Sequence, residues 1–202
     1  MNYKSYIQES FKASAENMAA LAQHDELINN LAQAADLVVE SYKKGGKLFI
    51  AGNGGSAADA QHIAAELVAK LSQDRTSIPA FALTVDTSLL TAVGNDYGYD
   101  YVFSRQVQGL VKPGDVFLAI TTSGNSPNIL KALEVCKQVG GKSILLTGKD
   151  GGKAKAEKMA DHFIVAPGKN TANIQEAHIA IYHTLCFMIE KGLVESGHVK
   201  YF

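Results

Sequence analysis

Residues 48–67 restrict the fold of this chain more than any other segment. They begin with a short apolar run, pass through a glycine-rich turn at residues 52–56, and end in a helical pattern. A strand joined to a helix by a tight turn is the repeating unit of an α/β fold. The turn also presents backbone N–H groups to an anion, so the segment predicts a binding role together with a fold class.

The alternation of strand and helix continues along the chain. Apolar runs predict strands at residues 47–51, 79–84, 116–121, 143–147 and 162–165. Helices are expected at residues 56–71, 87–93, 101–110, 127–139, 151–159 and 171–191, with a polar loop at residues 94–98. Ser126 is the expected N-cap of the helix that begins at Pro127. This order predicts a doubly wound, three-layer α/β sandwich with a central parallel sheet and helices on both faces.

Residues 1–44 lie outside this alternation. Their apolar positions recur at helical spacing, with an interruption near His24 and Asp25 that is typical of an N-cap. We therefore expect two N-terminal helices that pack on the sandwich or at a subunit interface. No repeat or interdomain linker divides the chain, so residues 1–202 are expected to form a single domain.

Composition excludes several classes of partner and location. The 19 basic and 20 acidic residues form no basic stripe, so nucleic acid is not an expected ligand. The first residues lack the apolar core of a signal peptide, and no apolar run approaches membrane-spanning length. We therefore expect a cytoplasmic protein without membrane contact. Cys136 and Cys186 lie in apolar helical patterns, which favours reduced core cysteines.

Two predicted strands end in small, polar loops, at residues 52–56 and 121–126. Ligands of open α/β sheets bind beyond the carboxyl ends of the strands. The hydroxyls of Thr121, Ser123 and Ser126, with the amides of the following helix, can hold a phosphate. No Walker lysine or G-x-G-x-x-G spacing is present, so the phosphate is expected on a small molecule. The alternative is that both loops are ordinary capped turns.

His62 and Glu66 are four residues apart in a predicted helix, so their side chains lie about 40° apart on one face. Such a pair can bind a metal or move a proton. Glu66 lies among alanine and leucine residues, and a carboxylate in an apolar setting needs a partner or a function. His62 taken alone could equally be a histidine of the core.

Together these motifs resemble the sugar isomerase (SIS) family. The likeness rests on the sequence GNGGSAADAQH from Gly52 and TSGNSPN from Thr122. It extends through AVGNDYG, FSRQV, LTGKDGG and IQEAH, and covers nearly the whole chain, which is therefore expected to be one SIS domain. Within the family, the chain is similar to the sedoheptulose 7-phosphate isomerases.

The resemblance implies a set of site residues. It implies one zinc ion per subunit, with the ligands His62, Glu66, Gln175 and His183. It implies substrate contacts at Asn53, Gly54, Gly55, Glu66, Asn95, Asp96, Thr121, Thr122, Ser123, Ser126 and Gln175. Two nitrogen and two oxygen ligands suit tetrahedral zinc. Gln175 and His183 are offset by about 80° on their helix and can face one cleft, whereas His178 is about 140° from His183 and is expected to point elsewhere.

The implied reaction interconverts sedoheptulose 7-phosphate and D-glycero-D-manno-heptose 7-phosphate through an enediol. Glu66 is the expected base, with a pKa raised by burial, and His183 the expected acid. Zinc can polarise the carbonyl. A group that ligates zinc is not free to transfer protons, so the sequence leaves open how Glu66 and His183 divide these two roles.

The resemblance also implies a homotetramer and a place at the first step of ADP-heptose biosynthesis for lipopolysaccharide or capsule. Two alternatives remain: a non-catalytic SIS regulator resembling the bacterial initiator-associating protein, and an isomerase of another phosphosugar. The chain departs from the family pattern at Ala69 and Lys70 and at Ala172 and Asn173. These departures affect the expected substrate affinity or subunit contacts, because lysine lacks the bidentate geometry of arginine.

Overall fold

The computed structural model describes residues 2–202, and its elements follow the predicted order. The helices are α1 (Tyr3–Leu21), α2 (Asp25–Lys43), α3 (Gly55–Val68), α4 (Thr87–Asp96), the 3₁₀ helix η1 (Tyr99–Tyr101), α5 (Ser104–Leu110), α6 (Pro127–Gln138), α7 (Gly152–Ala156) and α8 (Thr171–Glu195). The strands are β1 (Leu48–Gly52), β2 (Ala80–Ala82), β3 (Val116–Thr121), β4 (Lys142–Gly148) and β5 (His162–Ala166).

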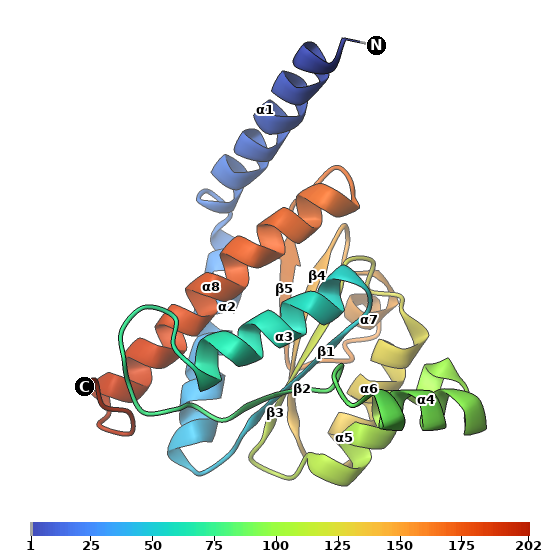
Figure 1. The fold of residues 1–202 in the computed structure, drawn as a ribbon, viewed down its shortest axis with the longest axis vertical. Coiled ribbons are helices and arrows are strands. Elements are labelled where there is room, and N and C mark those ends of the chain that lie inside the picture. The colour runs from blue at the N-terminus through green and yellow to red at the C-terminus, as the bar shows by residue number, and fades with distance from the viewer. Residues whose placement is uncertain (1) are drawn as a thin grey trace.

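The five strands form one parallel sheet in the order β2-β1-β3-β4-β5, which confirms the predicted doubly wound sandwich. Alternate residues of each strand enter different layers, because side chains alternate across a sheet. Leu48 and Ile50 of β1 belong to the core under α2, α3 and α8, whereas Phe49 and Ala51 belong to the core under α5 and α6. Figure 1 shows these helices on the two faces of the sheet.

The strand order reverses between β1 and β3, which are hydrogen-bonded neighbours. Gly52 at the end of β1 pairs with Ile120 near the end of β3. The loops at residues 52–56 and 121–126 therefore leave the same edge of the sheet side by side. This is the topological switch point at which open α/β sheets bind ligands.

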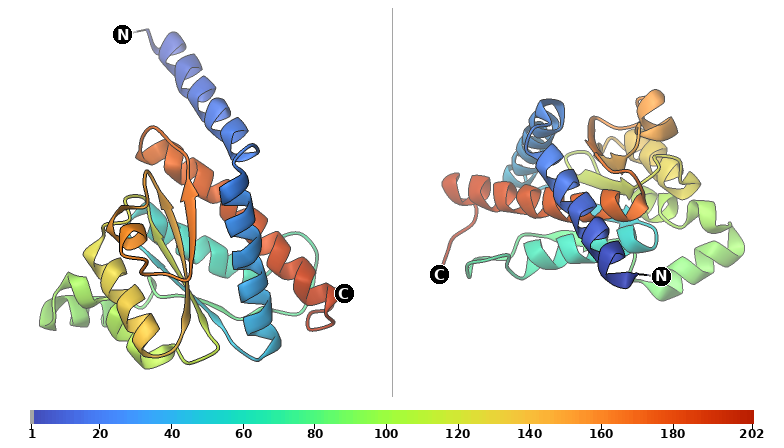
Figure 2. Two further views of the ribbon diagram at one scale, coloured as in Figure 1. Left: turned by 180° about the vertical axis from the view of Figure 1, so that it is seen from behind. Right: turned by 90° about the horizontal axis from the view of Figure 1, so that it is seen from above.

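The two N-terminal helices differ in how they pack. Helix α2 lies along α8 and β5 and contributes Leu27, Leu31 and Val38 to the core. Helix α1 has no buried residue and extends away from the sandwich, as Figures 1 and 2 show. The side-chain amide of Asn17 in α1 donates a hydrogen bond to the backbone carbonyl of Asn173 in α8, at 2.9 Å, and this contact attaches α1 to α8.

The structure places His24, the two cysteines and His178 as predicted, which confirms the expectations for these four side chains. The His24 ring caps α2 by accepting a hydrogen bond from the backbone N–H of Leu27, at 3.2 Å. Cys136 and Cys186 are buried free thiols, and burial raises the pKa of each to about 12. His178 is buried away from His183 and contacts the carbonyl of Thr147. None of the helices within residues 2–202 has the length and apolar character needed to cross a bilayer.

Other boundaries were predicted wrongly. The polar loop expected at residues 94–98 is in part helical, because α4 continues through Asp96 and its last turn closes when Tyr97 donates to the carbonyl of Val93. The helix expected over residues 101–110 begins only at Ser104, after η1. Helix α3 ends at Val68 instead of residue 71, and α8 continues to Glu195, four residues beyond its expected end.

Candidate functional site

Two helices on the same face of the sheet bring His62, Glu66 and His183 together. Nε2 of His62 lies 2.8 Å from Oε1 of Glu66, one helical turn away on α3. His183 comes from α8, and its ring meets that of His62 edge-on, with the ring centroids 5.0 Å apart. One ligand atom from each of the three residues lies within 4.8 Å of the others. Two imidazoles and a carboxylate at this spacing form a donor set that suits zinc.

Gln175 lies on the first turns of α8, beside the glycine turn after β1. Its side-chain amide packs so closely on Gly55 that a Cβ atom at that position would collide with it. Gly54, the residue before Gly55, has a φ of 56°, and glycine adopts this left-handed conformation without strain. Glycine at both positions therefore lets the turn approach the amide of Gln175.

Asn53 has partners that the sequence analysis did not identify. Its amide nitrogen donates to Oδ1 of Asn128, at 2.9 Å, and the amide nitrogen of Asn128 donates back, at 2.8 Å. The Tyr99 hydroxyl also donates to Oδ1 of Asn53, at 3.3 Å. Asn128 is buried in α6, so this amide pair joins the loop after β1 to the helix after β3. The only signal in the sequence was the place of Asn128 in the TSGNSPN motif.

Residues 121–126 form a loop, called the hydroxyl loop, whose hydroxyl groups lie close to one another. The Oγ atoms of Thr121 and Ser126 are 2.9 Å apart, and Ser123 lies 3.5 Å from Thr121. Ser126 occupies the N-cap of α6 as predicted, but its hydroxyl makes no capping bond to that helix. The backbone amides at the start of α6 therefore lie beside a cluster of hydroxyl donors, with Thr122 half-buried in the same loop. Such an arrangement can bind an anion.

Asn95 and Asp96 lie in the last turn of α4, and both are exposed. The Asn95 amide donates to Oδ1 of Asp96, at 2.8 Å. Within residues 2–202, no hydrogen bond or ion pair joins either residue to another of the predicted site residues. The structure thus joins His62, Glu66 and His183 in one group, Gly55 and Gln175 in a second, and Thr121, Ser123 and Ser126 in a third, but leaves Asn95 and Asp96 as a pair on their own.

The sequence analysis missed two buried residues near His62, and one of them, Tyr182, contacts its ring. Nδ1 of His62 lies 2.8 Å from the hydroxyl of the buried Tyr182, which precedes His183 on α8. Asp59 lies one turn before His62 on α3 and is also buried. Burial raises the pKa of Asp59 to about 6, against the opposing effect of His62 and of the Tyr182 hydroxyl. The helical spacing of Asp59, His62 and Glu66 was the available signal.

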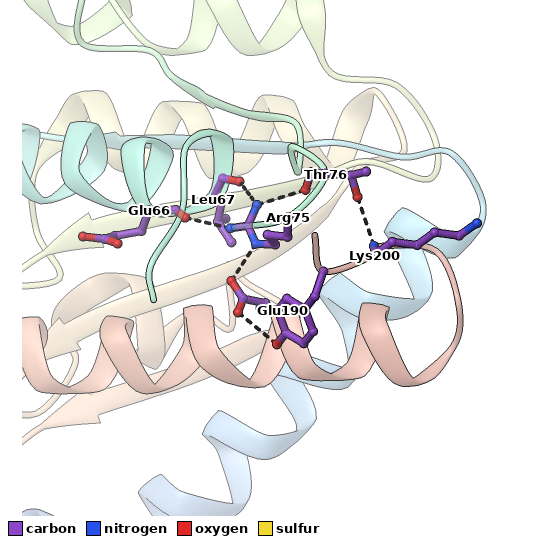
Figure 3. A network of polar contacts seen from close by, with 7 residues as sticks. Glu66, Leu67, Arg75, Thr76, Glu190 and Lys200 are labelled. Carbon is purple, nitrogen blue, oxygen red and sulfur yellow. Dashed lines mark hydrogen bonds and ion pairs between the residues drawn. The ribbon is translucent and has the colours of Figure 1, made fainter. Parts of the chain in front are cut away.

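A buried ion pair holds the end of α3 against α8 (Figure 3). Nε of Arg75 donates to Oε2 of Glu190 in α8, at 2.6 Å, and both side chains are almost fully buried. The guanidinium also donates to the backbone carbonyls of Glu66 and Leu67, each at 2.8 Å. The Tyr201 hydroxyl donates to the other oxygen of Glu190, at 3.1 Å. Arg75 therefore fixes the helical turn that carries Glu66.

The departures from the family pattern have local partners. Lys70 lies 3.7 Å from Asp74 in an exposed ion pair. Asn173 presents its carbonyl to Asn17 of α1 and is itself buried. This contact uses the backbone carbonyl, which any residue at position 173 would supply, and the side-chain amide of Asn173 donates instead to Oε2 of Glu176, at 3.3 Å.

Comparison with known proteins adds to this geometry. The model of the SIS domain family matches residues 10–148. The phosphoheptose isomerase of Sulfurimonas denitrificans is 50% identical over 194 residues, which cover 96% of this chain and 98% of that protein. The phosphoheptose isomerase of Aneurinibacillus thermoaerophilus is 46% identical over 195 residues, with coverage of 96% and 98%.

Solved structures of similar proteins share the fold over nearly the full length. The structure of the phosphoheptose isomerase GmhA from Neisseria gonorrhoeae has a TM-score of 0.86 and 40% identity, and the match covers 94% of this chain and 100% of that one. The phosphoheptose isomerase from Francisella tularensis has a TM-score of 0.89 and 39% identity, with coverage of 95% and 100%.

Proposed function

This chain belongs to the SIS domain family, and we propose on that basis that it is a phosphoheptose isomerase. Its reaction interconverts sedoheptulose 7-phosphate and D-glycero-D-manno-heptose 7-phosphate. One observation carries the proposal: relatives that match nearly the whole chain at about half identity bear this name. The gathering of His62, Glu66 and His183 at one site supports it. A regulator without catalytic function has no need of such a cluster.

The reaction moves a proton between two neighbouring carbons of the sugar. A base removes it from the carbon beside the carbonyl, an enediol forms, and the proton returns to the adjacent carbon. We assign the base to Glu66, which uses Oε1 to contact His62 and keeps its second oxygen for the substrate. We assign the acid that serves the sugar oxygens to His183, which lies across the cluster on α8.

We propose that His62, Glu66, Gln175 and His183 hold one zinc ion. The support is the close spacing of His62, Glu66 and His183, whose nitrogen and oxygen atoms are of the kind that zinc prefers. The chemistry that zinc supplies when bound is Lewis-acid polarisation of the substrate carbonyl. Glu66 can serve both roles through its two oxygens, one on the metal side with His62 and one toward the sugar.

We assign the phosphate to the hydroxyl loop and the start of α6. Its proposed contacts are Thr121, Thr122, Ser123 and Ser126. We assign to the sugar the residues of the glycine turn and its neighbour on α8: Asn53, Gly54, Gly55 and Gln175. The end of β1, where this turn begins, lies beside the end of β3 and so beside the hydroxyl loop, and Gly55 contacts Gln175 of α8. Asn95 and Asp96 are assigned to the substrate from the family resemblance alone.

We further propose a cytoplasmic homotetramer whose product enters ADP-heptose biosynthesis for lipopolysaccharide or capsule. The support for subunit contacts is apolar exposure, at Tyr3, Tyr6, Ile7 and Phe11 of α1 and at Ile179 and Phe187 of α8. The site is also open, since the His62 side chain is 43% exposed. A neighbouring subunit can cover both the helices and the site.

One assay tests the proposed function. The purified protein is incubated with sedoheptulose 7-phosphate, and the heptose 7-phosphate aldose is separated and quantified by chromatography and mass spectrometry. We expect turnover of this substrate and little of a hexulose or pentulose phosphate at the same concentration. Turnover of a different ketose phosphate alone, or binding without turnover, would favour the two alternatives and overturn the proposal.

A further inference from the structure

Asn128 is a buried polar residue that the proposed chemistry does not use. It lies in the first turn of α6, directly after Pro127, and is 2% exposed. Oδ1 of Asn128 accepts a hydrogen bond from Nδ2 of Asn53, at 2.9 Å, and Nδ2 of Asn128 donates to Oδ1 of Asn53, at 2.8 Å. A buried amide needs hydrogen-bonding partners, and Asn128 finds them on a single side chain.

This amide pair occupies most of the hydrogen-bonding capacity of Asn53. A side-chain amide has two N–H donors and an oxygen with two lone pairs. Asn128 takes one N–H and one lone pair, and the Tyr99 hydroxyl donates to the same oxygen, at 3.3 Å. Within residues 2–202 the second N–H of Asn53 has no acceptor, and Asn53 is only half-buried. The group that Asn53 can offer to a sugar oxygen is therefore a donor.

The amide pair lies where the two loops of the proposed site leave the sheet. Asn53 directly follows β1 and belongs to the glycine turn at residues 52–56, whereas Asn128 follows the hydroxyl loop. Gly52 and Ile120 are paired in the sheet, so the two segments start side by side. Two side-chain hydrogen bonds join the glycine turn to α6 in the described part of the chain, and both belong to the amide pair. The pair therefore connects the turn assigned to the sugar with the helix whose start is assigned to the phosphate.

We propose that Asn128 is a positioning residue that orients the side-chain amide of Asn53 for the sugar. The inference rests on the proposed function, which assigns Asn53 to the sugar. The terminal torsion of an asparagine side chain has a broad energy profile, so an amide without partners rotates readily. Asn128 holds the Asn53 amide in place before the substrate binds, and binding then carries no entropic cost for ordering it. In this arrangement Asn128 acts only through Asn53.

A purely structural role for Asn128 predicts a different result. Removal of Asn128 would then destabilise α6 and the hydroxyl loop, and substrate binding would weaken whatever residue stands at position 53. A double-mutant cycle separates the two roles, because it measures whether the effect of one residue depends on the presence of the other.

The cycle compares Asn128→Ala, Asn53→Ala and the double variant in the reaction of sedoheptulose 7-phosphate. We expect Asn128→Ala to raise KM by about 2- to 10-fold, as the loss of one hydrogen bond does, with little change in kcat. In the double variant KM should equal that of Asn53→Ala, because Asn128 then has no amide to orient. A wild-type KM in Asn128→Ala, or additive increases in KM in the double variant, overturns the proposal.

Gln106→Ala is the matched control for the loss of a buried amide. The Gln106 side chain is buried in α5 and donates to the carbonyls of Leu83 and Val102, which are not among the proposed site residues. We expect this variant to lose stability and to keep the wild-type KM. Melting temperatures of all variants check the fold.

A spectroscopic test needs no turnover. The protein is labelled with ¹⁵N-asparagine, and the side-chain signals of Asn53 are assigned by their loss in Asn53→Ala. We expect the heteronuclear NOE of the Asn53 amide to be as high as that of the backbone amides, and to fall in Asn128→Ala, or in the milder Asn128→Ser if the alanine variant does not fold. A side-chain amide of Asn53 that is as mobile in the wild type as that of the exposed Asn2 overturns the proposal. So does an unchanged NOE in the variant. If the wild type does not convert sedoheptulose 7-phosphate, the proposed function fails, and the NOE still decides whether Asn128 orders Asn53.

Discussion

Nη2 of Arg75 lies 2.8 Å from the backbone carbonyl oxygen of Glu66 and donates to it (Figure 3). The last carbonyls of a helix have no partner within the helix, and the guanidinium supplies two donors at this end of α3. Because the same guanidinium is paired with Glu190 of α8, the two helices that carry the candidate site are joined beneath it.

Breaking this ion pair should destabilise the fold strongly. In Arg75→Ala, Glu190 is left buried without its cation, so the free energy of unfolding should fall by about 3–5 kcal/mol. Urea denaturation measures the change. The double variant Arg75→Met/Glu190→Leu is the control, because it removes both charges and should lose less than Arg75→Ala. Equal stability of Arg75→Ala and wild type would contradict the structural role of the pair.

Replacing the proposed base should abolish turnover and spare the fold. Glu66→Gln keeps the shape of the side chain but removes its basicity, so kcat should fall by roughly 10²–10⁴-fold. The reaction of sedoheptulose 7-phosphate measures the loss, and the melting temperature should stay near that of the wild type. Glu195→Gln, the same change in an exposed ion pair with Lys191 at the end of α8, serves as the control. Normal turnover in Glu66→Gln would exclude Glu66 as the base.

Removal of metal should inactivate the protein reversibly. The cluster of His62, Glu66 and His183 offers two imidazoles and a carboxylate, so elemental analysis should find about one zinc per chain. Dialysis against a chelator should abolish turnover, and added zinc should restore it. Full activity in a sample free of metal would refute the proposed role of zinc.

The hydroxyl loop should affect substrate binding more than the chemical step. Ser126→Ala removes one donor from the proposed phosphate site, and a hydrogen bond to a charged group contributes about 1.5–3 kcal/mol. KM should therefore rise by roughly 10-fold or more with a small change in kcat, and inhibition by inorganic phosphate should weaken in parallel. Ser14→Ala in α1 provides the control. A drop in kcat at constant KM would place Ser126 in the chemistry instead.

Acid should destabilise the protein in part through His178. Burial lowers the pKa of His178 to about 4, below its ordinary value near 6.5. Between these pH values His178 is protonated in the unfolded chain and neutral in the folded chain. The stability that neutral His178 contributes is therefore fully present above pH 6.5 and is lost as the pH falls toward 4. The slope from this group reaches about 1.4 kcal/mol per pH unit. Urea denaturation at several pH values should show a smaller slope in His178→Gln, and an identical slope would contradict this assignment.

The fold could be predicted because its signals are local. The β3 and β4 segments are mainly apolar, as is expected of strands that are covered on both faces. Helix α6 lies between them in the sequence. The end of α4 was predicted wrongly, because Gly94 and Asn95 are typical of loops while the helical bond from Tyr97 to Val93 forms in the folded chain.

The candidate site could be predicted only in part. The pair of His62 and Glu66 follows from helical spacing, but its proximity to His183 depends on how α8 packs on α3. Tyr182 and Arg75 were missed for the same reason, whereas Asp59 was missed although it lies on the same helix as His62, one turn before it. A buried polar residue and its partner can be far apart in sequence, as Arg75 and Glu190 are, and no periodicity links them.

The first turns of α1 expose every residue from 3 to 12. An isolated helix of such length is only marginally stable in water, because its own hydrogen bonds barely offset the ordering of the chain. The order of these turns therefore depends on what covers them. Amide hydrogen exchange in residues 3–12, followed over a dilution series, should slow as the protein concentration rises, so that this segment serves as an internal gauge of association.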